Sequence, residues 1–302
     1  MFLKLYIFSI LVIQSLSSKP IIGILANPEP IESFEDKGDL VVGSYVRWLE
    51  SFGAEVVAIH QWYNEEQLEA LLSKINGVLF QGGDRVFNFS APWEKNGIYV
   101  INYARRTGLP LWGTCMGFEF ICDGILAEEI LEKYNDMSLL HPAILTEKTK
   151  TCKTYSKFTP ADFDIFEKKD STIYFHSLGV SEEGFNAKKE LVDLFDITSF
   201  GVDKDNKKFI NSIESKTGNI FGTQYHPEKN PYIRTNYDLE HTIDGLRMSH
   251  KVGLGFISVV RQNTNRMPYQ DRKQYDFINT FSKGTEKEYR KEDNSYYFER
   301  PY

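Results

Sequence analysis

Short apolar runs alternate with segments whose apolar side chains recur at helical spacing over residues 19–126. The segment 39–52 shows the helical pattern, with Val42, Tyr45, Val46 and Leu49 on one face before Gly53. Short links between such elements are typical of a parallel sheet with helices on both faces. The predicted strands are 19–25, 54–59, 77–80 and 109–112, and the predicted helices are 39–52, one that begins after the N-cap Asn64 with Gln67 at its third position, 97–106 and 118–126.

The second half of the chain is less regular. We expect strands at 171–180 and 191–200, a hairpin of 208–214 with 220–224, and helices at 255–262 and 274–281. The alternative for the first helix is that it begins earlier and is interrupted by the glycines. The charged, tyrosine-rich segment 283–302 is predicted to be a solvated C-terminal arm. Residues 19–302 are therefore predicted to form a single α/β domain, a three-layer sandwich with a mainly parallel central sheet.

The N-terminal residues differ from the rest. One lysine precedes an apolar run from Leu5 to Ile13, and small residues follow at 15–18, which is typical of a cleaved signal peptide over residues 1–18. The alternative is an amphipathic or transmembrane helix, but the run is short for a bilayer. No later segment has 18 consecutive apolar residues, so we expect no membrane association after cleavage. Entry into the secretory pathway would make the sequon at Asn88 a glycosylation candidate.

The net charge limits the classes of binding partner, and the cysteine count limits the possible disulfides. A net charge of −7 argues against nucleic acid or an anionic membrane surface. Three cysteines leave at least one thiol unpaired in a secreted protein. Cys122 and Cys152 are either paired or both free, and spacing alone does not decide between these.

The remaining cysteine, Cys115, lies in Gly113-Thr114-Cys115-Met116-Gly117, between a predicted strand and a predicted helix. This is the spacing of the G-x-S-x-G turn, with sulfur in place of oxygen, in which small neighbours let a nucleophile project from the sheet. The N-terminus of the helix is expected to lower the thiol pKa. The alternative is a buried cysteine at an ordinary strand–helix turn.

A base and an oxyanion site are also predicted. His226 closes a strand, Pro227 fixes the backbone after it, and Glu228 is close enough to orient the imidazole. Gly82 and Gly83 follow another strand and can turn backbone amides toward a ligand. The alternatives are a surface histidine beside a turn proline and a plain loop glycine pair. Because parallel sheets place ligands at the carboxyl ends of their strands, we expect these groups to meet at one edge.

The sequence resembles the γ-glutamyl hydrolases, also called folylpolyglutamate hydrolases, of the class I glutamine amidotransferase-like superfamily, which has a flavodoxin-like fold. The resemblance covers residues from about 19 to about 260. It rests on the stretches KPIIGIL, SYVRWLESFGAEVV, INGVLFQGG, LPLWGTCMGFE, YFHSLGVS and GTQYHPEKNPY.

The resemblance implies a cysteine-type omega peptidase without metal or cofactor. Cys115 would be the nucleophile, His226 the general base and then acid, and Glu228 its supporting carboxylate. The amides of Gly83 and Met116 would form the oxyanion hole, and His176 and Gly82 would bind substrate. The absence of an H-E-x-x-H or paired C-x-x-C motif agrees with a metal-free site.

The implied reaction is cleavage of γ-glutamyl bonds in folate or antifolate poly-γ-glutamates through a thioester on Cys115. Arg85, Lys229 and Arg234 are candidates for receiving the anionic tail. The resemblance also implies a homodimer and an extracellular, lysosomal or vacuolar location. Glutaminase or other amidase activity, or an inactive ligand-binding homologue, are the alternatives. Tyr225 replaces the usual tryptophan and Gln81 a frequent proline, and residues 235–250 and the tail match poorly, which leaves substrate preference open.

Overall fold

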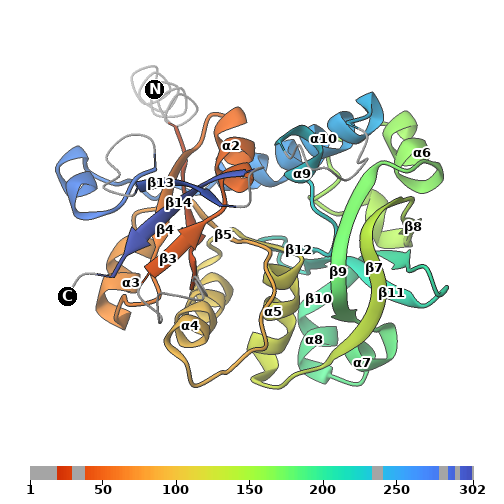
Figure 1. Ribbon diagram of the computed structural model, residues 1–302, viewed down its shortest axis with the longest axis horizontal. Helices are drawn as coiled ribbons and strands as arrows, with labels where there is room; N and C mark the ends of the chain where they lie inside the picture. The colour runs from red at the N-terminus through yellow and green to blue at the C-terminus, as the bar shows by residue number, and fades with distance from the viewer. Residues whose placement is uncertain (1–18, 29–37, 233–240, 279–284, 290–292, 301–302) are drawn as a thin grey trace, which may run out of the picture.

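A computed structural model describes residues 19–28, 38–232, 241–278, 285–289 and 293–300. Its centre is an eight-stranded sheet in the order β4-β1-β5-β6-β12-β11-β10-β8 (Figure 1). The first five strands in this order run parallel to one another, and each of the last three pairs antiparallel with the strand before it. The mainly parallel central sheet is as predicted. In sheet order the strands are Glu55–Ile59, Ile21–Leu25, Gly77–Phe80, Leu111–Thr114, Ile220–Thr223, Lys208–Ser215, Phe195–Val202 and Ile144–Leu145.

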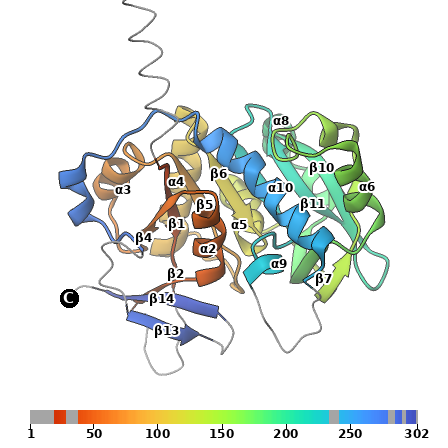
Figure 2. The same cartoon turned by 90° about the horizontal axis from the view of Figure 1, so that it is seen from above.

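Helices cover both faces of the sheet, each over its own apolar core (Figure 2). Strand β1 shows why: Ile21 and Leu25 lie in one core and Ile22 and Ile24 in the other, because successive side chains of a strand point to opposite faces. One core is covered by α3 (Glu65–Leu72), α4 (Pro92–Thr107), α5 (Met116–Leu126), α7 (Glu182–Asn186) and α8 (Lys189–Leu194), and the other by α2 (Gly43–Ser51), α6 (Pro160–Lys168) and α10 (Ile243–Val260), with the short α9 (Lys229–Tyr232) against α2 and α10.

Two smaller sheets flank the central one. Strand β9 (Thr172–Val180) was predicted, but it pairs outside the main sheet with β7 (Leu131–His141), a strand that the sequence pattern did not indicate. The other small sheet has the order β13-β14-β3-β2, with β13 Thr285–Tyr289, β14 Asp293–Glu299, β3 Gly38–Val41 and β2 Asn27–Pro28.

This second sheet corrects two predictions. The predicted helix 39–52 begins only at Gly43, because residues 38–41 pair with β14 as strand β3. The C-terminal segment is not a solvated arm over its described residues 293–299, since Tyr297 and Phe298 are each 4% exposed. Pairing between distant parts of the chain here overrides the local pattern.

Several boundaries also differ from the prediction. Helix α3 has the predicted capping box between Asn64 and Gln67, and β11 and β12 form the predicted hairpin. Helix α10 begins at Ile243 and runs through its glycines without interruption. Two of these glycines allow close packing, Gly253 against Phe52 and Gly255 against the Thr154 carbonyl. Residues 191–194 belong to a helix rather than a strand.

The predicted helix 274–281 is wrong over its described part. Instead, the described residues form two 3₁₀-helices, η1 (Glu147–Lys150) and η2 (Tyr269–Gln274), and Phe277 after η2 bridges to Val57 of β4. Residues 279–281 and the predicted signal peptide 1–18 lie outside the described residues. In the described ranges, no helix combines the length and apolar character needed to cross a bilayer.

Candidate active site

Three neighbouring parallel strands end at one edge of the central sheet. Strand β5 leads to Gly82 and Gly83, β6 to Cys115, and β12 to His226, and these strands are adjacent in the order β5-β6-β12. A Cβ placed on Gly82 would lie 2.9 Å from His226 Cε1 and 3.4 Å from Cys115 Cβ. The predicted meeting of these groups at one sheet edge is therefore observed.

Cys115 occupies a strained turn between β6 and α5. Its backbone has φ 53° and ψ −117°, a conformation that residues other than glycine rarely adopt. The flanking glycines are required by close backbone contacts: a Cβ on Gly117 would lie 2.2 Å from the Phe80 carbonyl oxygen, and one on Gly113 2.6 Å from that of Gly117. Strain of this kind is characteristic of a nucleophile turn.

The Cys115 thiol is buried. The side chain is 3% exposed, and Sγ donates to the Phe175 carbonyl oxygen at 3.7 Å. Burial, and next the charge of Glu119, raise the pKa of Cys115 well above its ordinary value, although the Met116 amide acts in the opposite direction. The predicted lowering by the helix N-terminus is therefore wrong, because desolvation of the thiolate outweighs it.

His226 is arranged as a neutral base. Its Nδ1 lies 2.7 Å from Glu228 Oε1, so Nδ1 carries a proton and its N–H donates a hydrogen bond to the carboxylate. Burial lowers the pKa of His226, and the neighbouring Glu228 opposes this only in part. Nε2 is buried and has no hydrogen-bond partner among the described residues. The unprotonated nitrogen is thus available to accept a proton.

The turn after β5 is held by side chains from two elements and by backbone carbonyls from two others. The Gly82 N–H donates to the Tyr45 hydroxyl at 2.8 Å, and the Gly82 carbonyl accepts from Asn27 Nδ2 at 3.0 Å. Gln81 is fixed by the backbone of β1 and β3. Since both backbone groups of Gly82 are occupied, its predicted substrate-binding role is not supported. The Gly83 N–H has no acceptor among the described residues, and Met116 lies against Gly83.

His176 differs from the prediction. Its Nδ1 lies 2.7 Å from the Leu178 carbonyl oxygen and its Nε2 lies 3.1 Å from Asp136 Oδ2. The side chain is 1% exposed. With both ring nitrogens engaged, His176 ties β9 to β7, and the predicted substrate contact is not supported.

Comparison with known proteins agrees with this arrangement. The family described as Glutamine amidotransferase class-I matches residues 34–241. Gamma-glutamyl hydrolase of Bos taurus is 31% identical over 220 residues, covering 71% of this chain and 69% of the bovine one. The chain belongs to the γ-glutamyl hydrolase family. Gamma-glutamyl hydrolase B of Dictyostelium discoideum is 29% identical, covering 88% of this chain and 79% of that one, and the human enzyme is 27% identical, covering 88% and 85%.

Solved structures show the same fold. The glutaminase domain of Trypanosoma brucei CTPS with bound acivicin has a TM-score of 0.52 at 13% identity, covering 83% of this chain and 97% of that domain. A chain of PurLQS from Thermotoga maritima has a TM-score of 0.51 at 14% identity, covering 80% and 99%. The γ-glutamyl hydrolase family member described here is a hydrolase with the fold of class I glutamine amidotransferases.

Three polar residues of this family member lie at the site and were missed by sequence reasoning. Tyr45 was recognised only as part of the apolar face of a helix. Burial raises the pKa of Glu119 to about 8, and its Oε1 accepts from Gln224 Nε2 at 2.7 Å. Gln224 Oε1 is buried with no partner among the described residues. Both residues flank the quoted cysteine and histidine motifs, and that proximity was the available signal.

The three cationic residues predicted to receive an anionic tail differ in how far the structure supports that role. Arg85 Nε pairs with the buried Glu94 at 2.7 Å, which does not support a role in binding a ligand's tail. Lys229 Nζ lies over the Phe175 ring, 5.1 Å from its centroid, and its charge acts on Cys115 and His226. Arg234 lies outside the described residues.

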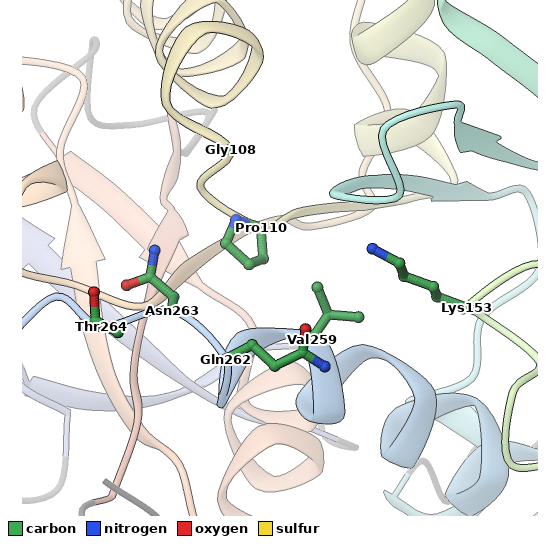
Figure 3. A pocket seen from close by; sticks show the side chains of 7 residues that line it. All are labelled: Gly108, Pro110, Lys153, Val259, Gln262, Asn263 and Thr264. Carbon is green, nitrogen blue, oxygen red and sulfur yellow. The ribbon is translucent and has the colours of Figure 1, made fainter. Parts of the chain in front are cut away.

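Three further features of this family member concern its cysteines, its metal-binding groups and a cavity. All three cysteines are free, so Cys122 and Cys152 are not paired. Across the described ranges, His, Cys, Asp and Glu side chains form no group of three that could hold a metal ion. A cavity of about 310 Å³ is lined in part by Pro110 and Lys153 (Figure 3). Pro110 precedes β6 whereas Cys115 follows it, so this cavity lies at the opposite edge of the sheet.

Proposed function

We propose that this hydrolase cleaves γ-glutamyl amide bonds, with folate poly-γ-glutamates as the substrate class, through a thioester on Cys115. The observation that carries the proposal is the unpartnered Nε2 of a neutral His226 beside a strained cysteine turn. Relatives named gamma-glutamyl hydrolase support the choice of bond.

In the first step His226 Nε2 takes the Cys115 proton while sulfur forms a bond to the γ-carbonyl carbon. Because the thiol pKa is raised in the resting protein, this proton transfer accompanies attack rather than preceding it. The carbonyl oxygen becomes an oxyanion that the Gly83 and Met116 amides stabilise. Each such donor contributes about 3 kcal/mol to lowering the barrier in well-studied hydrolases.

In the second step the C–N bond breaks and the imidazolium of His226 gives its proton to the leaving glutamyl nitrogen. Water then gives a proton to His226 and forms a bond to the thioester carbon. The sulfur leaves and regains its proton from His226. Glu228 keeps its charge throughout and stabilises the imidazolium that forms twice in the cycle.

The test compares wild type with Cys115→Ala on pteroyl-poly-γ-glutamate at pH about 5 and 7, with glutamine as a parallel substrate. We expect wild type to release glutamate or glutamyl peptides and the variant to lose this activity. Turnover of glutamine in place of the γ-glutamyl peptide would identify a glutaminase. No hydrolysis by wild type would refute the proposed substrate.

We further propose that residues 1–18 direct the chain into the secretory pathway, and that Asn88 is glycosylated there. Asn88 is exposed, and its Oδ1 accepts from the Ser90 amide at 3.1 Å in a surface turn. Expression of the full chain in a eukaryotic host would show a mature N-terminus near residue 19 and a mass loss on deglycosylation, which Asn88→Gln would remove. An intact N-terminus would contradict the proposal.

A further inference from the structure

Two side chains hold the backbone of Gly82, one at its carbonyl and one at its N–H. Asn27, in the short edge strand β2, donates from Nδ2 to the Gly82 carbonyl oxygen at 3.0 Å. Tyr45, on α2, accepts the Gly82 N–H at 2.8 Å through a hydroxyl on a 3%-exposed side chain. A Cβ on Gly83 would lie 3.0 Å from Asn27 Nδ2, so the Asn27 amide packs directly against this turn.

The direction of the Gly83 N–H follows from peptide geometry. A trans peptide is planar, and its C=O and N–H point in opposite directions. The described chain contains no cis peptide bond. By holding the Gly82 carbonyl, Asn27 therefore also determines where the Gly83 N–H points.

Such a restraint is needed because both residues are glycines. With no Cβ on either side, this peptide can rotate at little steric cost. A rotated peptide would point a carbonyl oxygen, rather than an N–H, in the direction that the Gly83 N–H now takes. That carbonyl would repel a developing oxyanion instead of stabilising it.

We propose that Asn27 and Tyr45 are positioning residues that fix the Gly82–Gly83 peptide with the Gly83 N–H directed at the oxyanion. The proposal rests on the nucleophile and oxyanion roles of the proposed function. Asn27 acts on the carbonyl of the peptide and Tyr45 on the amide before it. The Tyr45 hydroxyl also lies 3.4 Å from His226 Nδ1, so one hydroxyl contacts both the turn and the base.

The test compares two reactions of the same sulfur. Acylation of Cys115 by p-nitrophenyl acetate forms a tetrahedral oxyanion: an S–C bond forms, p-nitrophenolate leaves, and the thiol proton passes to His226. Alkylation by iodoacetamide displaces iodide and forms no oxyanion. The variants are Asn27→Leu and Tyr45→Phe, and mass spectrometry assigns each adduct to Cys115, with Cys115→Ser as the blank.

Matched controls remove the same groups elsewhere. Asn102→Leu changes an exposed asparagine of α4, and Tyr99→Phe removes a hydroxyl that bonds Glu69. Neither residue contacts the turn, and both variants are expected to react like wild type with each reagent.

We expect Asn27→Leu to slow acylation about 10-fold or more, since losing an oxyanion donor outright costs about 10²–10³, while alkylation stays within about 2-fold. Tyr45→Phe should slow acylation similarly, and the double variant should lose less than the product of the single effects because both residues hold the same turn. Unchanged acylation, or a parallel loss of alkylation, would overturn the proposal. Wild-type Cys115 that alkylates but does not acylate would also overturn it. None of these outcomes requires γ-glutamyl cleavage, so failure of the proposed substrate remains distinguishable.

Discussion

The Nδ1 atom of His226 lies 2.7 Å from Oε1 of Glu228, and both side chains are buried. Burial alone would raise the pKa of Glu228, but the charge of His226 and its hydrogen bond lower it below the ordinary value. The carboxylate therefore stays ionised and fixes the imidazole tautomer. The two residues work as one unit, and separating their contributions requires changing one at a time.

Replacing Glu228 with glutamine should lower kcat at least about 10-fold, because the imidazolium loses its charged partner and general acid–base catalysis contributes about 10²–10⁴. Since Glu228 raises the pKa of His226 against burial, its neutralisation should also move the acid limb of kcat/KM to lower pH. Steady-state rates across pH check both effects. An acid limb that moves to higher pH would contradict this assignment.

The wild-type pH profile follows from the direction of the His226 shift. Burial lowers this pKa, so the neutral base persists below the ordinary histidine value of about 6.5. The raised thiol pKa means that no ionised Cys115 is needed beforehand. We expect kcat/KM to remain near its plateau into mildly acid solution, with an acid midpoint below 6.5. A midpoint above 7 would contradict the lowered pKa of His226.

Gly82→Ala should abolish most activity without unfolding the protein. The new Cβ would lie 2.8 Å from the Tyr45 hydroxyl and 2.9 Å from His226 Cε1, so the base must move. A misplacement of about 1 Å can cost about 10²-fold in rate, and kcat/KM is the quantity to measure. Gly124→Ala on α5 is the control, because the closest atom to its Cβ would be the flexible end of Ile101 at 3.0 Å, and the next atoms would be at ordinary contact distances of 3.4 Å and more. Equal activity of the two variants would exclude the close approach at Gly82.

His60 should make the free energy of unfolding fall as the pH rises above neutral. Its Nδ1 lies 2.9 Å from Asp39 and its Nε2 lies 3.0 Å from Asp276. Burial would lower the pKa of His60, but these two carboxylates raise it overall, and burial raises that of Asp39. The folded cluster thus binds more protons than the unfolded chain, so its contribution is complete below about pH 6.5 and is lost as pH rises through the folded His60 pKa.

Urea unfolding at pH 6 and 8.5 measures this change. Asp276→Asn removes one carboxylate and should reduce the loss of unfolding free energy between the two pH values. An identical loss in the variant would show that Asp276 does not contribute.

Phe298→Ala tests whether the C-terminal strand is part of the core. Phe298 is 4% exposed and its ring contacts that of His60, with centroids 5.0 Å apart. Truncation should lower the free energy of unfolding by about 3 kcal/mol. Val86→Ala, at a position that is 78% exposed, should change it by less than about 0.5 kcal/mol. Equal stability of the two variants would place β14 outside the cooperative unit.

The sequence predicted the site well where the signal is local. A cysteine between two closely spaced glycines after an apolar run indicated the strained turn, and His226 followed by proline and glutamate indicated the base. Tyr45 could not be recognised, because its helical spacing explains an apolar face and its hydroxyl partner, Gly82, lies in the loop after β5, far away in the sequence. The thiol pKa was misjudged for a similar reason. Helix position is visible in the sequence, but burial under Phe175 is not.

The fold shows the same division. Alternating strands and helices predicted the parallel core, because each strand or helix can be recognised from the spacing of apolar residues within its own segment. The sequence pattern assigns residues 39–41 to a helix because Val42, Tyr45 and Val46 extend a helical pattern to their boundary. Only pairing with β14 makes these residues a strand, and nothing near them in the sequence indicates that pairing.

That pairing has a consequence for biosynthesis. Strand β3 directly precedes the helix that carries Tyr45, yet its partner β14 is translated long after it, with Tyr296 opposite Val41. A chain still emerging from the ribosome can therefore form its parallel core before β14 is available, but it then lacks the contact that secures β3. We expect a functional enzyme only after β14 has left the exit tunnel, when this contact of high sequence separation can close.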